Sequence, residues 1–328
     1  MERALVLGAT GFIGGHVALA ALEQGWEVRG LRRRTNATGH LENAQVRWID
    51  GDIDCYESLP PAFHGVDIVF HAAGFYPNHG RNVAAQVAHA VRQTRNVLQA
   101  AVQADVQRLI YTSSLTTIGH LLTDETRLVD ERDHYTPGSL SRSAYYECKY
   151  AMESEVLREA AYGFPTVVLN PTVVLGPGDL HRATGEIVLA IARGWGKFWL
   201  DVMMNVVDVR DAAQAHIRAA EVGRLGERYI LGGHNVNMRE LFSMLAEISG
   251  VRAPGFELPD GFLRLFLRTL GRLPVFGRLS NHLWGIRRWR GFDTDKAKRE
   301  LNLDPRPIED TLSDAVAWYR TSGYLAEK

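Results

Sequence analysis

The chain has 328 residues, of which 46% are hydrophobic and 23% are charged, a balance typical of a folded globular protein with a sizeable core. Its formal net charge of −1 excludes the strong basic field of a nucleic-acid-binding protein, and no apolar run is long enough to span a bilayer. Two cysteines, Cys55 and Cys148, and a first segment that reads as a core strand predict a cytoplasmic protein without disulfides. The 12 histidines form no H-E-x-x-H motif and there is no paired C-x-x-C, so we expect no metal site.

The first 34 residues predict a strand, a glycine-rich turn, a helix and a second strand. The strands cover residues 3–8 and 26–31, the helix covers 15–24, and the turn reads Gly8-Ala9-Thr10-Gly11-Phe12-Ile13-Gly14. Glycines at this spacing let the backbone approach a pyrophosphate, whose charge is favoured by the free N–H groups at a helix start. The segment therefore predicts a nucleotide site.

Apolar runs and helical stretches continue to alternate as far as residue 170. We expect strands at 46–49, 66–71, 109–112 and 166–169, and helices at 82–104 and 141–161. This alternation predicts an α/β fold of the Rossmann type, a doubly wound parallel sheet with helices on both faces. The dinucleotide-binding domain would cover residues 1–170, with elements returning at 200–232.

From residue 171 the pattern loosens, and residues 171–328 predict a small, mostly helical cap that binds the substrate. We expect short strands at 206–209 and 229–231, and helices at 211–222, 238–249, from 293, and 308–322, with Asn237 as an N-cap. The stretch 262–289 interleaves aromatic and aliphatic residues with arginines. An amphipathic lid with arginines in water is the preferred interpretation, and peripheral contact with an anionic bilayer is the alternative.

Tyr145 and Lys149 are four residues apart on a predicted helix and therefore share one face. An ammonium about 5 Å from a phenol, at an effective dielectric constant of ~20, favours the phenolate by roughly 3 kcal/mol. On its own such a pair is usually a solvated helix face. The nucleotide turn, and Ser114 at the end of a strand, favour a catalytic Tyr145 instead.

Several motifs follow one another in an order that is typical of one family. They are Gly8-Ala9-Thr10-Gly11-Phe12-Ile13-Gly14, Gly51-Asp52-Ile53, His71-Ala72-Ala73-Gly74, Tyr111-Thr112-Ser113-Ser114, Tyr145-x-x-x-Lys149, Asn170-Pro171-Thr172 and Val207-Asp208-Val209-Arg210-Asp211. The chain resembles the extended short-chain dehydrogenases/reductases of the NAD-dependent epimerase/dehydratase superfamily. It is most similar to the dihydroflavonol reductase-like branch, which also holds 3β-hydroxysteroid dehydrogenases and hopanoid-associated sugar epimerase-like proteins.

The resemblance implies catalytic roles for three residues. Tyr145 would be the general acid/base, Lys149 would hold the nicotinamide ribose and make the phenol more acidic, and Ser114 would hydrogen-bond the reacting oxygen. Ser113 is the alternative to Ser114. The resemblance also implies a homodimer, formed through the helix of Tyr145 and the helix at 82–104.

The implied cofactor contacts run from the adenine to the nicotinamide. Asp52 and Ile53 would border the adenine. The full set of expected cofactor-binding residues is Gly8, Thr10, Gly11, Phe12, Ile13, Gly14, Arg32, Asp52, Ile53, Ala72, Ala73, Gly74, Tyr145, Lys149, Pro171 and Thr172. One motif departs from the family, because Ala90-Val91-Arg92-Gln93-Thr94-Arg95-Asn96 stands where members often have N-V-x-G-T-x-N. We therefore expect packing or hydration near the catalytic helix to differ.

Arg32, followed by Arg33 and Arg34, ends the second strand, where an acidic residue would select NAD. Arginine favours a 2′-phosphate, so we expect NADP(H) rather than NAD(H); a solvated basic turn is the alternative.

The expected substrate pocket is largely apolar. Its candidate residues are Phe75, Tyr76, Thr116, Met203 and Met204. These favour reduction of an aldehyde or ketone. The alternatives are a nucleotide-sugar epimerase, which usually has an arginine near position 203, a 3β-hydroxysteroid dehydrogenase-like enzyme, and a non-catalytic NADP-binding sensor.

Overall fold

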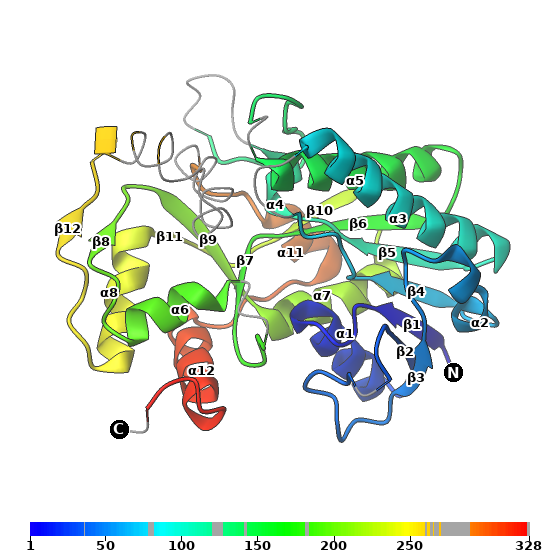
Figure 1. The fold of residues 1–328 in the computed structure, drawn as a ribbon, viewed down its shortest axis with the longest axis horizontal. Helices are drawn as coiled ribbons and strands as arrows, with labels where there is room; N and C mark the ends of the chain where they lie inside the picture. Colours follow the sequence, from blue (N-terminus) through cyan, green and yellow to red (C-terminus); the bar gives the residue numbers. More distant parts are fainter. Residues whose placement is uncertain are drawn as a thin grey trace.

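A computed structural model describes residues 1–35, 37–77, 82–119, 127–140, 143–180, 184–259, 261–262, 265, 269 and 289–326. Within these residues, seven parallel strands form one sheet in the order β10-β6-β5-β4-β1-β2-β3 (Figure 1). The strands are β1 (Arg3–Leu7), β2 (Glu27–Arg32), β3 (Arg47–Asp50), β4 (Ile68–His71), β5 (Arg108–Thr112), β6 (Thr166–Pro171) and β10 (Arg228–Leu231). The order turns at β1 and β4, which is where doubly wound sheets bind their ligands.

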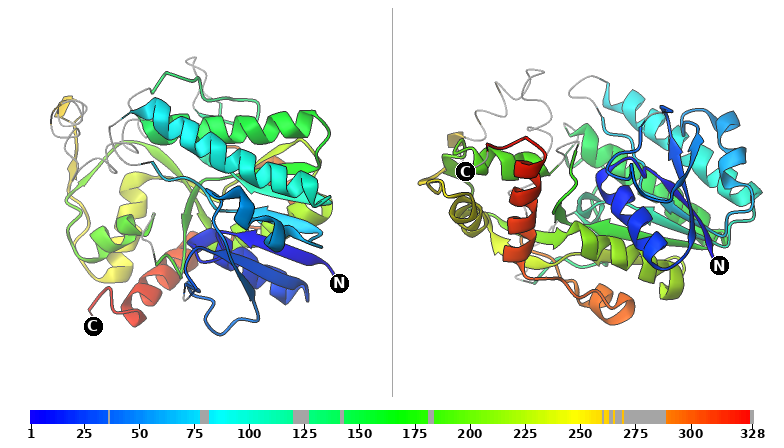
Figure 2. Two further views of the ribbon diagram at one scale, coloured as in Figure 1. Left: turned by 45° about the vertical axis from the view of Figure 1, so that its right-hand side comes forward. Right: turned by 90° about the horizontal axis from the view of Figure 1, so that it is seen from below.

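Helices cover both faces of this sheet, as the alternating pattern predicts (Figure 2). On one face α1 (Phe12–Glu23) packs against α7 (Val209–Val222), and on the other α3 (Val83–Gln103) packs against α5 (Ala144–Ala161). Ala4 and Val6 of β1 belong to the first apolar core, whereas Leu5 and Leu7 belong to the second. The predicted Rossmann-type fold class is confirmed.

The second part of the chain adds a cap with its own core. Its described part contains a three-stranded sheet, β11 (His234–Asn237), β9 (Met203–Asp208) and β7 (Val173–Leu175), besides the expected helices. The helices α6 (Gly185–Ala192), α8 (Met238–Ser249) and α12 (Ile308–Thr321) pack together, and β8 (Phe198–Trp199) pairs with β12 (Phe256–Glu257). The helix α11 (Asp295–Leu301) returns to the large sheet, where it packs on α7 and β10. The short elements η1 (Tyr56–Ser58), α2 (Pro60–Phe63) and α4 (Leu115–Ile118) complete the described chain.

Two helix starts show how the sequence sets the boundaries. Asn237 caps α8 as predicted, because its side chain accepts a hydrogen bond from Arg239 N at 2.9 Å. The strand predicted at 206–209 was wrong at both ends, because β9 begins at Met203. Asp208 accepts from Arg210 N at 2.8 Å and starts α7 at Val209, so the strand β9 ends one residue earlier.

The stretch 262–289 lies almost wholly outside the described residues, so its interpretation as a lid stays a prediction. Among the described helices, none combines the length and the apolar character needed to cross a membrane.

Candidate active site

Ser114 and Tyr145 face each other across the ends of two elements. Ser114 follows β5 and caps α4, and Tyr145 is the second residue of α5. Their Oγ and Oη atoms are 3.5 Å apart, and both side chains are buried. Ser113 is directed elsewhere, with its Oγ 3.4 Å from Thr117 Oγ1. Of the two serines, Ser114 therefore faces the phenol.

Thr116 orients the serine hydroxyl. Both the N–H and the Oγ1 hydroxyl of Thr116 donate to Ser114 Oγ, at 3.3 and 3.0 Å. Because these bonds occupy the acceptor side of the oxygen, the hydrogen of Ser114 is left to donate toward the phenol or a substrate oxygen.

Lys149 lies one helical turn after Tyr145 and is also buried. Its Nζ is 5.9 Å from the centroid of the Tyr145 ring and 5.7 Å from that of Tyr76. A Cβ placed on Gly74 would lie 3.2 Å from this Nζ, so the turn after β4 closely approaches the ammonium. The predicted Gly74, Tyr145 and Lys149 therefore meet at one point.

The glycine turn has the shape that a pyrophosphate needs. Gly8 has a φ of 87°, and a Cβ there would come within 2.8 Å of Ala73 N. A Cβ on Gly14 would lie 2.3 Å from the Gly8 carbonyl oxygen. Gly11 is the N-cap residue of α1 and provides no side-chain cap, and the first turn of α1 carries no acidic residue. The N–H groups at this helix end are thus available to an anionic ligand, which fits the dinucleotide.

The other expected residues of this turn contact the protein around it. Phe12 and Ile13 are half-buried against the core beneath α1, and Ala72 N donates to Leu7 O at 3.0 Å. The carbonyl oxygen of Thr10 closely approaches Gly39, since a Cβ on Gly39 would lie 2.7 Å from it.

The expected adenosine end contains an ion pair that the sequence did not indicate. Arg32 Nε donates to Asp50 Oδ1 at 2.8 Å, and the guanidinium lies 5.6 Å from the Trp48 ring centroid. The bond from Arg32 lowers the pKa of Asp50. Arg33 and Arg34 are exposed and form no ion pair with a described residue. The predicted phosphate ligand Arg32 is thus held by a carboxylate at the end of β3.

The turn after β3 is held by the helix whose motif departs from the family. Asn96 Nδ2 donates to Ile53 O at 2.9 Å, and Asp52 N donates to Ser58 Oγ at 2.9 Å. Gln93, in place of the motif's glycine, is buried, and its Oε1 has no partner in the described structure. The departure therefore puts a polar side chain into the core beneath α5.

Polar contacts surround the end of β6, next to which the nicotinamide is expected. Pro171 ends β6, and the next residue, Thr172, donates through Oγ1 to Asn205 Oδ1 at 2.8 Å. Asn205 is buried and also accepts from Gly233 N at 3.0 Å. Asn205 belongs to the stretch Met203-Met204-Asn205, near which the resemblance leads us to expect an arginine in epimerases, and its side chain bonds neighbouring strands and turns of the protein instead.

The expected substrate residues are only partly brought together. Tyr76 is 60% exposed, its ring centroid lies 5.6 Å from that of Tyr145, and Thr116 hydrogen-bonds Ser114. Phe75 packs on His89 with centroids 4.8 Å apart. Met204 is 1% exposed and lies in the cap core. The backbone of Met203 forms an isolated β-bridge with that of Arg290. Tyr76 and Thr116 therefore lie next to Tyr145 and Ser114, whereas Met204 is covered.

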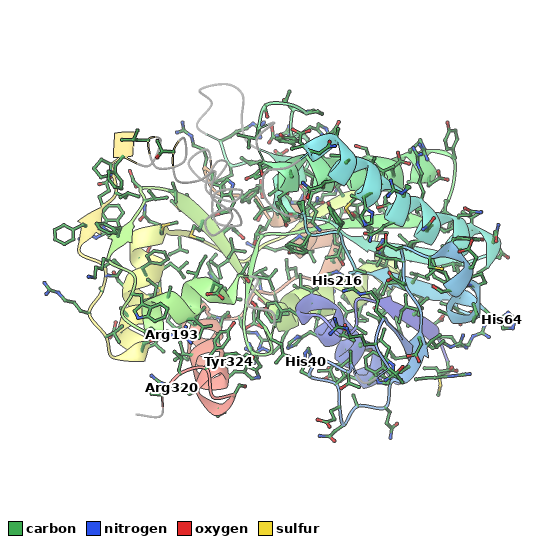
Figure 3. The ribbon with its side chains drawn as sticks, in the orientation of Figure 1. His40, His64, Arg193, His216, Arg320 and Tyr324 are labelled. Atoms are coloured by element: carbon green, nitrogen blue, oxygen red, sulfur yellow. The ribbon has the colours of Figure 1, made fainter. Side chains whose placement is uncertain are left out.

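Two buried histidines lie under the site. Burial, and then the charge of Lys149, lower the pKa of His71 to about 3. Burial lowers the pKa of His216, which is labelled in Figure 3, to about 4. Its Nε2 is 2.8 Å from Thr112 Oγ1. Both rings are therefore neutral at physiological pH. No group of three or more His, Cys, Asp or Glu among the described residues is arranged to hold a metal.

Comparison with known proteins decides the family. The model of the "NAD dependent epimerase/dehydratase family" matches residues 4–232. The chain belongs to this family. A Synechocystis protein provisionally named dihydroflavonol 4-reductase is 32% identical, over 98% of this chain and 95% of its own. Cinnamoyl-CoA reductase 1 of Petunia hybrida is also 32% identical, over 98% and 92%.

A solved structure is similar over the whole chain. It is PA4631, described as a nucleoside-diphosphate-sugar epimerase from Pseudomonas aeruginosa, with a TM-score of 0.84, 29% identity and 99% coverage of each chain. The predicted family is confirmed, and the protein is an NAD(P)-dependent oxidoreductase of the extended short-chain dehydrogenase/reductase type.

Sequence reasoning predicted no role for four side chains near the candidate site, those of Thr117, Glu153, Asn170 and Arg228. Glu153 carried a signal, because it follows Tyr145 and Lys149 at the same four-residue spacing. The other three contact Glu153 from different elements, and of these only Asn170 belonged to a motif that the sequence indicated, without a role for its side chain.

Proposed function

We propose that this protein is an NADP(H)-dependent oxidoreductase that reduces an aldehyde or a ketone. The single observation that carries the proposal is the 3.5 Å separation of Ser114 Oγ and Tyr145 Oη beside a buried Lys149. Two relatives are named as reductases, which supports reduction as the direction of the reaction.

The residues have distinct roles in this reaction. When bound, the reduced dinucleotide supplies the hydride. Ser114 donates a hydrogen bond to the carbonyl oxygen of the substrate, and Tyr145 gives that oxygen its proton. The ammonium of Lys149 then faces the tyrosinate that remains, and burial strengthens their attraction.

The proposed cofactor site follows the glycine turn. Gly8, Gly11 and Gly14 would admit the pyrophosphate, and Lys149 would bind the nicotinamide ribose. Arg33 and Arg34 are available for a 2′-phosphate, and Arg32 would join them by leaving Asp50. We also propose a cytoplasmic homodimer that pairs through α3 and α5.

A nucleotide-sugar epimerase is the second candidate, because PA4631 carries that description and matches the whole chain. The stretch Met203-Met204-Asn205 weighs against it, since none of these residues offers a cation to a substrate pyrophosphate. A 3β-hydroxysteroid dehydrogenase-like activity would use the same catalytic residues, and a non-catalytic sensor would not need them.

The test is a screen for NADPH or NADH oxidation at 340 nm with a dihydroflavonol, vestitone, cinnamoyl-CoA and a ketosteroid, beside an assay for UDP-glucose epimerisation. We expect carbonyl-dependent NADPH oxidation, which Tyr145→Phe should lower by about 10²- to 10⁴-fold while NADPH still binds. Tyr150→Phe is the matched control on the same helix, where the ring packs on Tyr135. Epimerisation without carbonyl reduction would favour the second candidate, and full turnover by Tyr145→Phe would overturn the mechanism.

A further inference from the structure

Glu153 places a buried carboxylate behind the catalytic pair. It follows Lys149 by one helical turn and Tyr145 by two, and it is 4% exposed. Its Oε2 accepts from Thr117 Oγ1 at 2.6 Å and from Asn170 Nδ2 at 2.7 Å. These short distances are typical of charge-assisted hydrogen bonds. One carboxylate thus joins α5 to α4 and β6.

The two partners of this carboxylate also contact the backbone of Ser114. The carbonyl oxygen of Ser114 lies 2.8 Å from Thr117 Oγ1 and 3.3 Å from Asn170 Nδ2. The single hydrogen of Thr117 is therefore shared between Ser114 O and Glu153 Oε2. Any displacement of the carboxylate changes the position of the Ser114 carbonyl.

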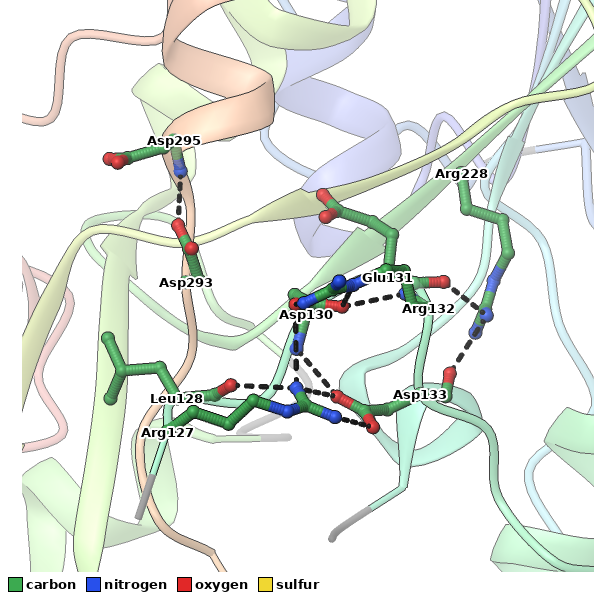
Figure 4. Close-up of polar contacts among 9 residues, drawn as sticks. All are labelled: Arg127, Leu128, Asp130, Glu131, Arg132, Asp133, Arg228, Asp293 and Asp295. Carbon is green, nitrogen blue, oxygen red and sulfur yellow. Dashed lines mark hydrogen bonds and ion pairs between the residues drawn. The ribbon is translucent and has the colours of Figure 1, made fainter. Parts of the chain in front are cut away.

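A buried arginine completes the network. Arg228 Nε lies 3.0 Å from Glu153 Oε1, and the two side chains are almost fully buried. Its Nη1 donates to the carbonyl oxygens of Glu131 and Asp133 at 3.2 and 3.1 Å (Figure 4). Removing either charge would leave the other one buried without compensation.

The distance between the catalytic hydroxyls depends on two separate elements. Tyr145 moves with α5 and Ser114 moves with α4, and 3.5 Å is already at the outer limit of a hydrogen bond. Glu153 bonds the α4 side while belonging to α5. We propose that Glu153, acting through Thr117 and Asn170 and neutralised by Arg228, is a positioning residue that sets the separation of Ser114 and Tyr145. The inference rests on the proposed reductase function.

Thr117→Val is the primary test, because it keeps the side-chain shape and removes the shared hydroxyl without leaving a bare charge. Thr94→Val is the matched control. Thr94 is equally buried, and its hydroxyl bonds Ala90 O within α3, at 3.0 Å. With NADPH and the carbonyl substrate found in the screen, we expect Thr117→Val to lower kcat by about 10- to 100-fold. The KM for NADPH should stay within about twofold, and Thr94→Val should keep the wild-type kcat.

A double-mutant cycle separates positioning from general damage. In a Ser114→Ala background, Thr117→Val should lower kcat by less than about twofold further, because its effect passes through the missing hydroxyl. An equal loss in both backgrounds would overturn the proposal.

Crystal structures of the same variants give a readout that needs no turnover. We expect the separation of Ser114 Oγ and Tyr145 Oη to grow by at least about 0.5 Å in Thr117→Val and to stay unchanged in Thr94→Val. An unchanged separation in Thr117→Val would also overturn the positioning role. If the wild-type protein reduces no carbonyl compound, the proposed function fails, while this distance still decides whether the network positions the pair.

Discussion

Three glycine-to-alanine substitutions separate the cost of a left-handed backbone from the cost of a steric contact. Gly8 and Gly14 lie in the glycine turn, and Gly25 lies outside it. Gly25 has a φ of 74° and open space around its missing Cβ, so Gly25→Ala carries only the left-handed strain of about 1–2 kcal/mol. Gly14→Ala carries only a contact, of 2.3 Å with the Gly8 carbonyl oxygen, which overpacking costs put at about 1–3 kcal/mol. Gly8→Ala combines a φ of 87° with a 2.8 Å contact to Ala73 N and should lose about 2–5 kcal/mol.

Urea unfolding measures these losses, and NADPH fluorescence measures binding. Gly25→Ala should bind NADPH as the wild type does, because Gly25 lies beyond the far end of α1. Gly14→Ala should weaken binding by about tenfold or more, because relieving the contact moves the helix end away from the turn. If Gly14→Ala bound NADPH with unchanged affinity, the pyrophosphate would not lie against this turn.

Three further expectations concern buried groups and the Arg32 pair. Burial raises the pKa of Cys148 to about 12, whereas Cys55 is exposed, so a thiol reagent at neutral pH should label one cysteine per native chain, and none in Cys55→Ser. Between about pH 6.5 and pH 4, His216 is protonated in the unfolded chain but neutral in the folded chain. The free energy of unfolding therefore falls as the pH falls. His216→Gln should remove about 1.4 kcal/mol per pH unit from that slope in urea titrations; an unchanged slope would contradict the assignment. Asp50→Asn should free Arg32 and raise the affinity for NADPH over NADH by about two- to fivefold in titrations, and a shift toward NADH would contradict the assigned role.

The parts of the fold that were predictable come from local patterns. The opening strand, turn, helix and strand are encoded within one stretch of sequence, and so is the spacing of Tyr145 and Lys149 on α5. Of the cap sheet, only a strand at 206–209 was predicted, within what is β9. The strand β7 was missed because it is a three-residue apolar run without alternation. Periodicity cannot distinguish such a run from a piece of helix.

Pairing between strands explains what was missed at the cofactor end. Arg32 and Asp50 are opposite each other in the register of β2 and β3. Register depends on which strands become neighbours, and the order of the sheet is not written in any single segment. The three arginines therefore indicated a phosphate site, while the carboxylate that holds Arg32 remained hidden.

The surroundings of Ser114 and Tyr145 show the same limit. A glutamate on a helix usually indicates a solvated face, and only packing reveals that Glu153 is buried and needs a cation. That cation comes from β10, an edge strand of the sheet, which follows β7 and β9 of the cap in the sequence. The charge of Glu153 is thus balanced only once the sheet is complete. Glu153 thus links Arg228 of β10 to the two groups that contact Ser114, so the proposed positioning role depends on a contact between segments far apart in the sequence.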